Sequence, residues 1–282
     1  RRWTIGGATS GDTGGAAIAA YKNSSHATTL SLHPHCKVSN VQRRQITMVD
    51  SSSIHNIAME GNFDDCPAIV KALFNDAGFR DQVRLAGVNS INWSRIMAQI
   101  VYYVYSAVAL GSPDRKVSFC VPTGNFGDIF AGLSAKRMGV PIDRLIIATN
   151  VNDILDRALK TGRYEMLGVE ASTSPSMDIQ VSSNFERLLF FAYGRNSAAV
   201  RSLMAGLSQS GSFTIGPKEL AAIRAEFDSA AIGEAGTAKT IAQTLGRTGK
   251  LLEPHTAGGL AAARQAKHSA SPSSTQDQAQ PA

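Results

Sequence analysis

Three short segments of the 282-residue chain carry residue types that could bind an anion. They are residues 6–14, 89–95 and 122–128, and each follows a short apolar run and precedes a helix-like run. The first and third are rich in glycine, and the second combines Asn, Ser and Arg. Backbone N–H groups at a helix start can hold a phosphate or carboxylate, and glycine lets the backbone approach such a ligand closely. The spacing therefore predicts anion-binding loops.

Each segment also has an ordinary structural interpretation, and spacing alone leaves it open. Residues 6–14 could form a Gly-rich turn with a Ser or Asp cap, and residues 122–128 a tight turn between strand and helix. In residues 89–95, Ser90 or Asn92 could cap a helix while Arg95 points to solvent. Residues 6–14 are not a Walker loop, because no Lys-Ser or Lys-Thr pair closes them. Their glycine spacing is also not that of a GxGxxG fingerprint.

Composition and residue spacing argue against nucleic-acid-binding, membrane, disulfide-rich and metal-binding proteins. The net charge is +6, but the basic residues are scattered without interleaved aromatics, so we predict no nucleic-acid partner. No apolar run approaches the roughly 20 residues of a membrane span, so no membrane partner is predicted. The three cysteines are far apart, which suggests neither disulfides nor a zinc site and fits a reducing cytoplasm. His33, His35 and Cys36 lack a fourth ligand at suitable spacing, so no metal is predicted.

Strand-like and helix-like runs alternate along the chain. The expected strands are residues 4–7, 28–32, 54–59, 85–88, 116–121 and 145–149. The expected helices are residues 13–21, 38–44, 64–75, 93–110, 129–138, 153–159, 184–193, 198–207, 217–227 and 235–244. This order predicts an α/β fold with two open, mainly parallel sheets flanked by helices. In such folds ligands bind at the carboxyl ends of strands, where the three loops fall.

The predicted domain organisation has two α/β parts and a tail. Gly111, Ser112 and Pro113 separate a smaller domain, residues 1–110, from a larger one, residues 111–266. Residues 267–282 are rich in Ser, Gln, Ala and Pro and are predicted to be disordered.

Eight segments in order resemble the threonine synthases of the bacterial and fungal type. They are GATSGDTG (7–14), VQRRQITMV (41–49), GNFDDC (61–66), NSINWSRIMAQIVYY (89–103), VPTGNFGDIFAG (121–132), ATNVNDIL (148–155), SPSMDIQVSSNFERLLF (174–190) and EPHTAGG (253–259). Those enzymes use pyridoxal 5'-phosphate and have the tryptophan synthase β fold (fold type II). The match runs from about residue 3 to residue 265, nearly the whole chain.

The resemblance implies a role for specific residues. The loop that binds the cofactor phosphate is matched by Gly124, Asn125, Phe126, Gly127 and Asp128. Thr256 matches the residue whose hydroxyl bonds the pyridine nitrogen. The loop that closes on the substrate amino acid is matched by Ser10, Asp12 and Thr13, and the group that receives the substrate phosphate by Asn89, Ser90, Asn92 and Arg95. On this basis the smaller domain carries the substrate loop and the larger one the cofactor-phosphate loop.

The implied reaction is that of a carbon–oxygen lyase acting on phosphates in threonine biosynthesis. O-phosphohomoserine and water give threonine and inorganic phosphate, so two phosphate groups need binding loops. The lysine that forms the family's Schiff base is expected upstream of Arg1, and an apolar strand is expected after about residue 265. We therefore expect a fragment with little activity on its own and an incomplete larger domain. The oligomeric state is unknown.

Two alternatives stay open at this point. One keeps the fold and the cofactor but changes the enzyme to another lyase acting on a phosphorylated hydroxy-amino acid. The other is a non-catalytic, truncated relative that binds anions or the cofactor. The loop at residues 89–95 favours a phosphorylated substrate but does not distinguish among such substrates.

Overall fold

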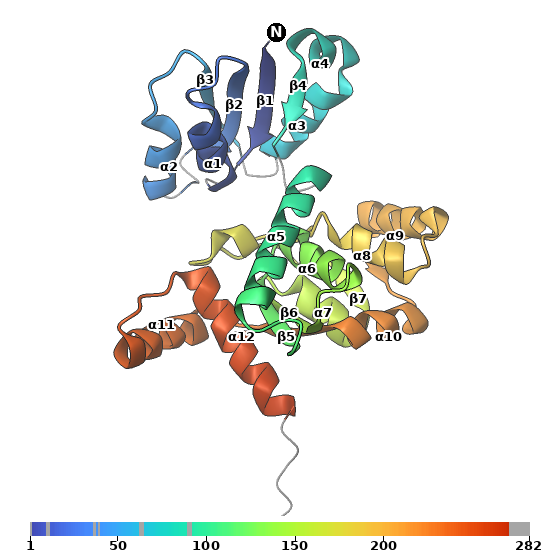
Figure 1. Cartoon of the computed structure of the whole chain (residues 1–282). Coiled ribbons are helices and arrows are strands. Elements are labelled where there is room, and N and C mark those ends of the chain that lie inside the picture. Colours follow the sequence, from blue (N-terminus) through green and yellow to red (C-terminus); the bar gives the residue numbers. More distant parts are fainter. Residues whose placement is uncertain are drawn as a thin grey trace, which may run out of the picture. The chain divides into compact units, whose positions relative to one another are not determined.

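The computed structural model describes residues 2–9, 12–35, 38, 40–61, 65–88 and 92–270, without the side chains of Asp12, Gln42, Pro67 and residues 267–270. The chain divides into two compact units, Arg1–Asn92 and Trp93–Ala282. Figure 1 shows the elements of each unit. Among the described residues, no helix combines the length and the apolar character that a bilayer crossing requires.

The first unit is a four-stranded parallel sheet in the order β3-β2-β1-β4. Its strands are β1 (Trp3–Ala8), β2 (Ala27–Pro34), β3 (Ile54–Met59) and β4 (Leu85–Gly87). Its helices are α1 (Asp12–Tyr21), α2 (Asn40–Thr47), α3 (Asp65–Asn75) and α4 (Ala77–Val83).

Both faces of this sheet are covered. Ile54 packs with Ile18 of α1 and Ile46 of α2, whereas Leu32 packs with Cys66 and Val70 of α3. Ile54 is in register with Thr29, an odd number of residues from Leu32, so the two clusters lie on opposite faces. This is the layered arrangement expected when strands and helices alternate.

The second unit contains a three-stranded parallel sheet in the order β5-β6-β9 and an antiparallel pair, β7 and β8. The strands are β5 (Val117–Pro122), β6 (Ile142–Thr149), β7 (Arg163–Glu165), β8 (Ser212–Thr214) and β9 (Phe227–Ala231). The helices are α5 (Trp93–Ala109), α6 (Gly127–Arg137), α7 (Ile154–Thr161), the 3-10 turn η1 (Pro175–Met177), α8 (Phe185–Ala192), α9 (Ser197–Ser210), α10 (Pro217–Glu226), α11 (Glu234–Thr248) and α12 (Pro254–Ala270). The predicted α/β class with two parallel sheets is confirmed.

The central strand β6 is apolar on both faces. Ile147 points into the main core with α6, α7 and α8, while the next residue, Ala148, packs with Ala230 and Ala262 under α12. Small residues let α12 lie close to the sheet: a Cβ on Gly259 would stand 3.2 Å from Pro122. The start of α12 therefore packs directly against the end of β5.

The boundary between the units differs from the predicted one after residue 110, because it falls between Asn92 and Trp93. The helix α5 belongs to the second unit because it packs on α6. Tyr103 donates a 2.9 Å hydrogen bond to the Asp128 carbonyl, and its ring lies 4.9 Å from that of Phe119.

Residues 267–270, the first four of the predicted tail, are helical because α12 continues through them. Alanine and lysine in this stretch favour helix and extend it past the predicted end. The rest of the predicted tail, residues 271–282, lies outside the described residues.

Candidate functional site

The loop from β5 to α6 has the form that the sequence predicts, a turn at the carboxyl end of a parallel strand. Phe126 adopts a left-handed φ of 66° directly before α6, and its side chain is buried. Phe126 is the N-cap residue of α6, and its side chain makes no hydrogen bond to the helix start. The side-chain oxygen of Asn125 accepts a 2.8 Å hydrogen bond from the Gly127 amide. The first turn of a helix has amide groups without helical partners, so this turn can receive an anion.

The carbonyl groups of this loop are held by residues 176–184. Ser182 donates its hydroxyl to the Gly124 carbonyl at 2.6 Å. Asn184 donates to the Asn125 carbonyl from its backbone, at 2.9 Å, and from its side chain, at 3.1 Å. A Cβ on Gly124 would stand only 2.3 Å from the Ser176 carbonyl oxygen, so only glycine fits there. These contacts fix the peptide planes of the loop.

Asp128 in the first turn of α6 lies in an apolar environment. Its Oδ1 atom is buried and has no hydrogen-bond partner among the described residues. Burial raises the pKa of the Asp128 carboxyl, and burial also raises the pKa of Tyr103, which bonds the Asp128 backbone. Burial therefore disfavours the charged form of the Asp128 carboxyl, and a hydrogen bond from Tyr103 opposes this shift of its pKa.

Thr256 lies in the first turn of α12, beside a capping carboxylate. Its hydroxyl donates to Glu253 Oε1 at 2.6 Å and its amide donates to the same atom at 2.5 Å. Glu253 Oε2 accepts from the His255 amide at 3.0 Å and lies 2.8 Å from His255 Nδ1. Burial raises the pKa of Glu253, but hydrogen bonds from Thr256 and His255 outweigh it and bring the value to about 2. Glu253 is therefore an ionised helix cap.

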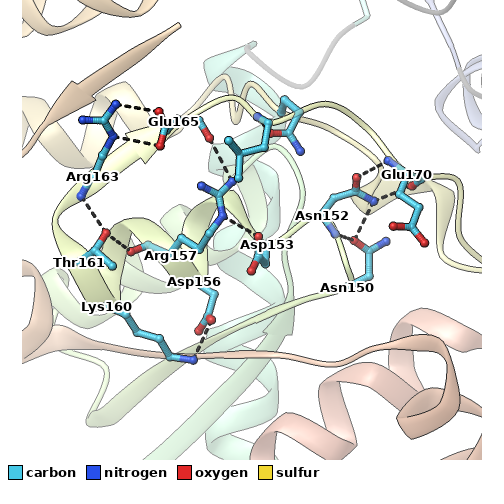
Figure 2. A network of polar contacts seen from close by, with 12 residues as sticks. Asn150, Asn152, Asp153, Asp156, Arg157, Lys160, Thr161, Arg163, Glu165 and Glu170 are labelled. Carbon is cyan, nitrogen blue, oxygen red and sulfur yellow. Dashed lines mark hydrogen bonds and ion pairs between the residues drawn. The ribbon is translucent and has the colours of Figure 1, made fainter.

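Residues 170–182 are supported by a polar network at the end of β6. The Asp178 carboxylate accepts hydrogen bonds from the side-chain amides of Asn150, at 2.7 Å, and Asn152, at 3.0 Å, and from Ser172. Asn152 also exchanges hydrogen bonds with the Glu170 backbone, as Figure 2 shows. The network holds the segment that contacts Gly124. Sequence reasoning assigned no role to these residues, because nothing in their spacing shows that they meet.

Arg95 lies in the first turn of α5. Its Nη1 atom is buried and has no hydrogen-bond partner among the residues described, and burial lowers the pKa of the guanidinium. A buried guanidinium nitrogen without a hydrogen-bond partner in the described structure suits an anionic ligand. Asn92 precedes the helix and donates its side-chain amide to the Gly87 carbonyl at 3.2 Å. Asn89 and Ser90 lie outside the described residues.

The turn from β1 to α1 carries the other predicted loop. Asp12 begins α1, Thr13 follows it, and Ser10 lies outside the described residues. The buried hydroxyl of Thr9 accepts a 2.8 Å hydrogen bond from the Gly14 amide. A Cβ on Gly7 would stand 2.6 Å from the Val88 carbonyl oxygen. A strand ending at Ala8 and a helix beginning at Asp12 flank the predicted loop, whose residues 10 and 11 lie outside the described residues.

Within the second unit, the structure brings two of the predicted segments to a common neighbour. Ser176 contacts Gly124 through its carbonyl and donates its amide to His255 Nε2 at 3.3 Å. Residues 124–128 and Thr256 are thus joined through residues 174–178, although they are far apart in sequence. The end of a β-strand and the starts of two helices lie together in this unit, which is the kind of position where α/β folds bind ligands.

The model of the pyridoxal-phosphate dependent enzyme family matches residues 2–276, so the chain belongs to this family. Within the family it is similar to threonine synthases. The enzyme of Pseudomonas aeruginosa is 53% identical over 270 residues, which are 96% of this chain and 58% of that protein. A PLP-bound threonine synthase from Brucella melitensis is 59% identical with a TM-score of 0.88, over 94% of this chain and 57% of that one.

A yeast threonine synthase is 40% identical with a TM-score of 0.84, over 94% of this chain and 55% of that one. The chain therefore spans little more than half the length of these relatives. A maize serine racemase has a TM-score of 0.62 at 15% identity, which shows the shared fold alone. The predicted tryptophan synthase β-like fold is confirmed.

The residues of the β5–α6 loop fit the phosphate of this family's cofactor. The Gly127 amide donates to Asn125 Oδ1, whereas Phe126 at the N-cap position makes no side-chain hydrogen bond, so the amides that follow in the first turn can face an anion. Close packing of Gly124 on the Ser176 carbonyl holds the loop backbone in place. In the described structure, Arg95 Nη1 is buried without a partner, which also suits an anion.

Proposed function

We propose that this chain carries the cofactor- and substrate-binding parts of a threonine synthase, which converts O-phosphohomoserine and water to threonine and phosphate. The observation that carries the proposal is the identity of 53% and 59% to two threonine synthases across almost the whole chain. The turn from β5 into α6 supports it, because Phe126 at the N-cap position makes no side-chain hydrogen bond to the helix start.

In this proposal residues of the second unit hold the cofactor. The loop formed by Gly124, Asn125, Phe126, Gly127 and Asp128 binds its phosphate through backbone amides, with the α6 dipole adding attraction. The Gly127 amide donates to Asn125 Oδ1 in the structure and would exchange that partner for the phosphate. Pyridoxal phosphate, when bound, withdraws electrons from the substrate as protons leave its carbon atoms. Thr256 would bond the pyridine nitrogen through its hydroxyl group. In the structure this hydroxyl donates to Glu253 Oε1, so it would turn away from Glu253 to donate to an unprotonated pyridine nitrogen.

The remaining predicted residues handle the substrate. Ser10, Asp12 and Thr13 bind its amino acid end and carboxylate. Asn89, Ser90, Asn92 and Arg95 receive its phosphate group. The buried, unpartnered Nη1 of Arg95 in the described structure supports an anionic ligand at this residue. A released phosphate held by the same residues could also stabilise charge and move protons during the reaction.

A chimera tests this function. Residues 1–265 replace the matched segment of the Pseudomonas aeruginosa threonine synthase, which supplies the remaining parts of a full-length enzyme. We expect the purified chimera to release threonine and phosphate from O-phosphohomoserine in equal amounts. A folded chimera that binds pyridoxal phosphate but forms 2-oxobutyrate, or no product, would contradict the proposal and favour another lyase or a non-catalytic relative.

A further inference from the structure

A chain of contacts links the start of α12 to the β5–α6 loop. The Ser176 amide donates to His255 Nε2 at 3.3 Å, and the Ser176 carbonyl lies against Gly124. On the other side of the ring, His255 Nδ1 is 2.8 Å from Glu253 Oε2. The imidazole therefore bridges the α12 cap and the segment that packs on the loop.

These partners define the tautomer of His255. An amide N–H is a donor only, so Nε2 must be the unprotonated nitrogen that accepts it. The proton then lies on Nδ1, which donates to the Glu253 carboxylate. Glu253 is ionised and can only accept, so it favours this tautomer and holds the ring in place.

The bridge reaches the loop at a different group from the ones that Ser182 and Asn184 bond. Those residues bond the carbonyls of Gly124 and Asn125, whereas Ser176 limits the space at the Gly124 α-carbon. Withdrawal of Ser176 would remove the restraint at the Gly124 α-carbon, while the Gly124 carbonyl would stay bonded to Ser182. The amide groups of the α6 start would then lose part of their fixed orientation.

We propose that His255, oriented by Glu253, is a positioning residue that holds Ser176 against Gly124 and so fixes the amide groups that bind the cofactor phosphate. This inference rests on the proposed function of the loop. It assigns no contact between His255 and the cofactor or the substrate.

The test measures binding of pyridoxine 5'-phosphate to the full chain by calorimetry. This probe carries the phosphate and the ring but no aldehyde, so it forms no imine. Replacing His255→Leu removes the acceptor for Ser176 and should weaken binding about tenfold, the effect expected for one orienting hydrogen bond. Replacing His255→Gln supplies a side-chain oxygen as acceptor and should restore affinity to within about threefold of the original.

Glu253→Gln separates orientation from helix capping. If Glu253 acts through His255, this change weakens binding in the original chain but not in the His255→Gln chain. Long-range ¹H–¹⁵N spectra of the imidazole should show the Nδ1–H tautomer in the original chain and a mixture in Glu253→Gln. A capping role alone would give the same loss in both backgrounds and no change of tautomer.

The outcomes distinguish failure of the role proposed for His255 from failure of the proposed cofactor site. If the original chain binds the probe and His255→Leu binds it equally well, the inference is wrong and the proposed function stands. If His255→Gln is as weak as His255→Leu, packing rather than the hydrogen bond is responsible, and the inference is also wrong. If the original chain does not bind the probe, the proposed cofactor site fails and takes this inference with it.

Discussion

At the scale of single residues, Arg95 shows a conflict between stability and binding. Its buried Nη1 has no partner in the described part of the chain, which is unfavourable for folding without ligand. Replacing Arg95→Met keeps much of the apolar stem and removes this cost. We expect the free energy of unfolding to rise by about 1–2 kcal/mol, as for buried charges replaced by apolar groups.

Urea denaturation of the chain measures this change, and Arg201→Met, at an exposed position of α9, serves as control. The same Arg95→Met change in the chimera should raise KM for O-phosphohomoserine. A chain that loses stability on Arg95→Met would show that the guanidinium is satisfied without ligand, against the proposed anion site.

Glu253 should make the stability of the folded chain depend on pH. Its pKa of about 2 in the folded chain lies below the ordinary value of 4.5. The carboxylate therefore stabilises the fold above the ordinary value, and this contribution is lost as the pH falls from about 4.5 toward 2. The unfolding midpoint of Glu253→Gln should decline less steeply across this window than that of the original chain.

Glu186→Gln, at an exposed position of α8, is the matched control and should follow the original curve. Parallel pH curves for the original chain and Glu253→Gln would mean that the hydrogen bonds to Glu253 do not favour its ionised form.

At the scale of elements, the polar network at the end of β6 keeps residues 170–182 in place. Asp178 accepts four hydrogen bonds, from Asn150, Asn152 and Ser172. In Asp178→Asn an amide group would face these donors. We expect a loss of about 2–4 kcal/mol in the free energy of unfolding, since several half-buried donors lose their acceptor.

The affinity for pyridoxine 5'-phosphate should fall in the same variant, because Ser176 and Ser182 reach the loop from this segment. Asp114→Asn, in an exposed turn, is the control for the loss of one charge. Unchanged stability and affinity in Asp178→Asn would show that the network does not support the loop.

Most elements could be predicted from sequence because their periodicity is strong. The strand Ile54–Met59 has the predicted bounds, and α5 ends one residue before its predicted end. The strand β9 was missed, because its residues Phe227–Ala231 lack β-branched side chains and follow the helix α10 without a turn. Its place is set by pairing with β6. The helix α12 was missed because Gly258 and Gly259 lower its helix propensity.

The candidate site was predictable only in part for a similar reason. Glycine spacing after an apolar run indicates the loop at residues 124–128. The support from Ser176, Ser182 and His255 depends on contacts between residues far apart in sequence. Short-range patterns carry no information about such contacts. The domain boundary was misplaced because α5 packs on α6, which the turn at residues 111–113 does not indicate.

At the scale of the whole molecule, the two units have cores of different size. Among the described residues, the first unit buries two small clusters, whereas the second buries an extended cluster that includes Leu145 and a small one under α12. We expect two calorimetric transitions, with the first unit melting at the lower temperature. Ile18→Ala should lower the first transition and Leu145→Ala the second, each by about 2–5 kcal/mol in its own unit.

Either variant shifting both transitions together, or a single transition in the original chain, would show that the two units unfold as one. That result would contradict the division at Asn92, because each unit would then depend on the other for its stability.

The central claim is that the β5–α6 loop binds the cofactor phosphate. The most direct test is a ¹H–¹⁵N NMR titration of the chain with pyridoxine 5'-phosphate. The account predicts that the largest shifts fall on the amides of residues 124–128 and that Gly124→Ala, whose Cβ would stand 2.3 Å from the Ser176 carbonyl, abolishes them. Gly246→Ala, with nothing within 4 Å of its Cβ, should leave them unchanged. Shifts confined to other residues, or equal in Gly124→Ala, would contradict it.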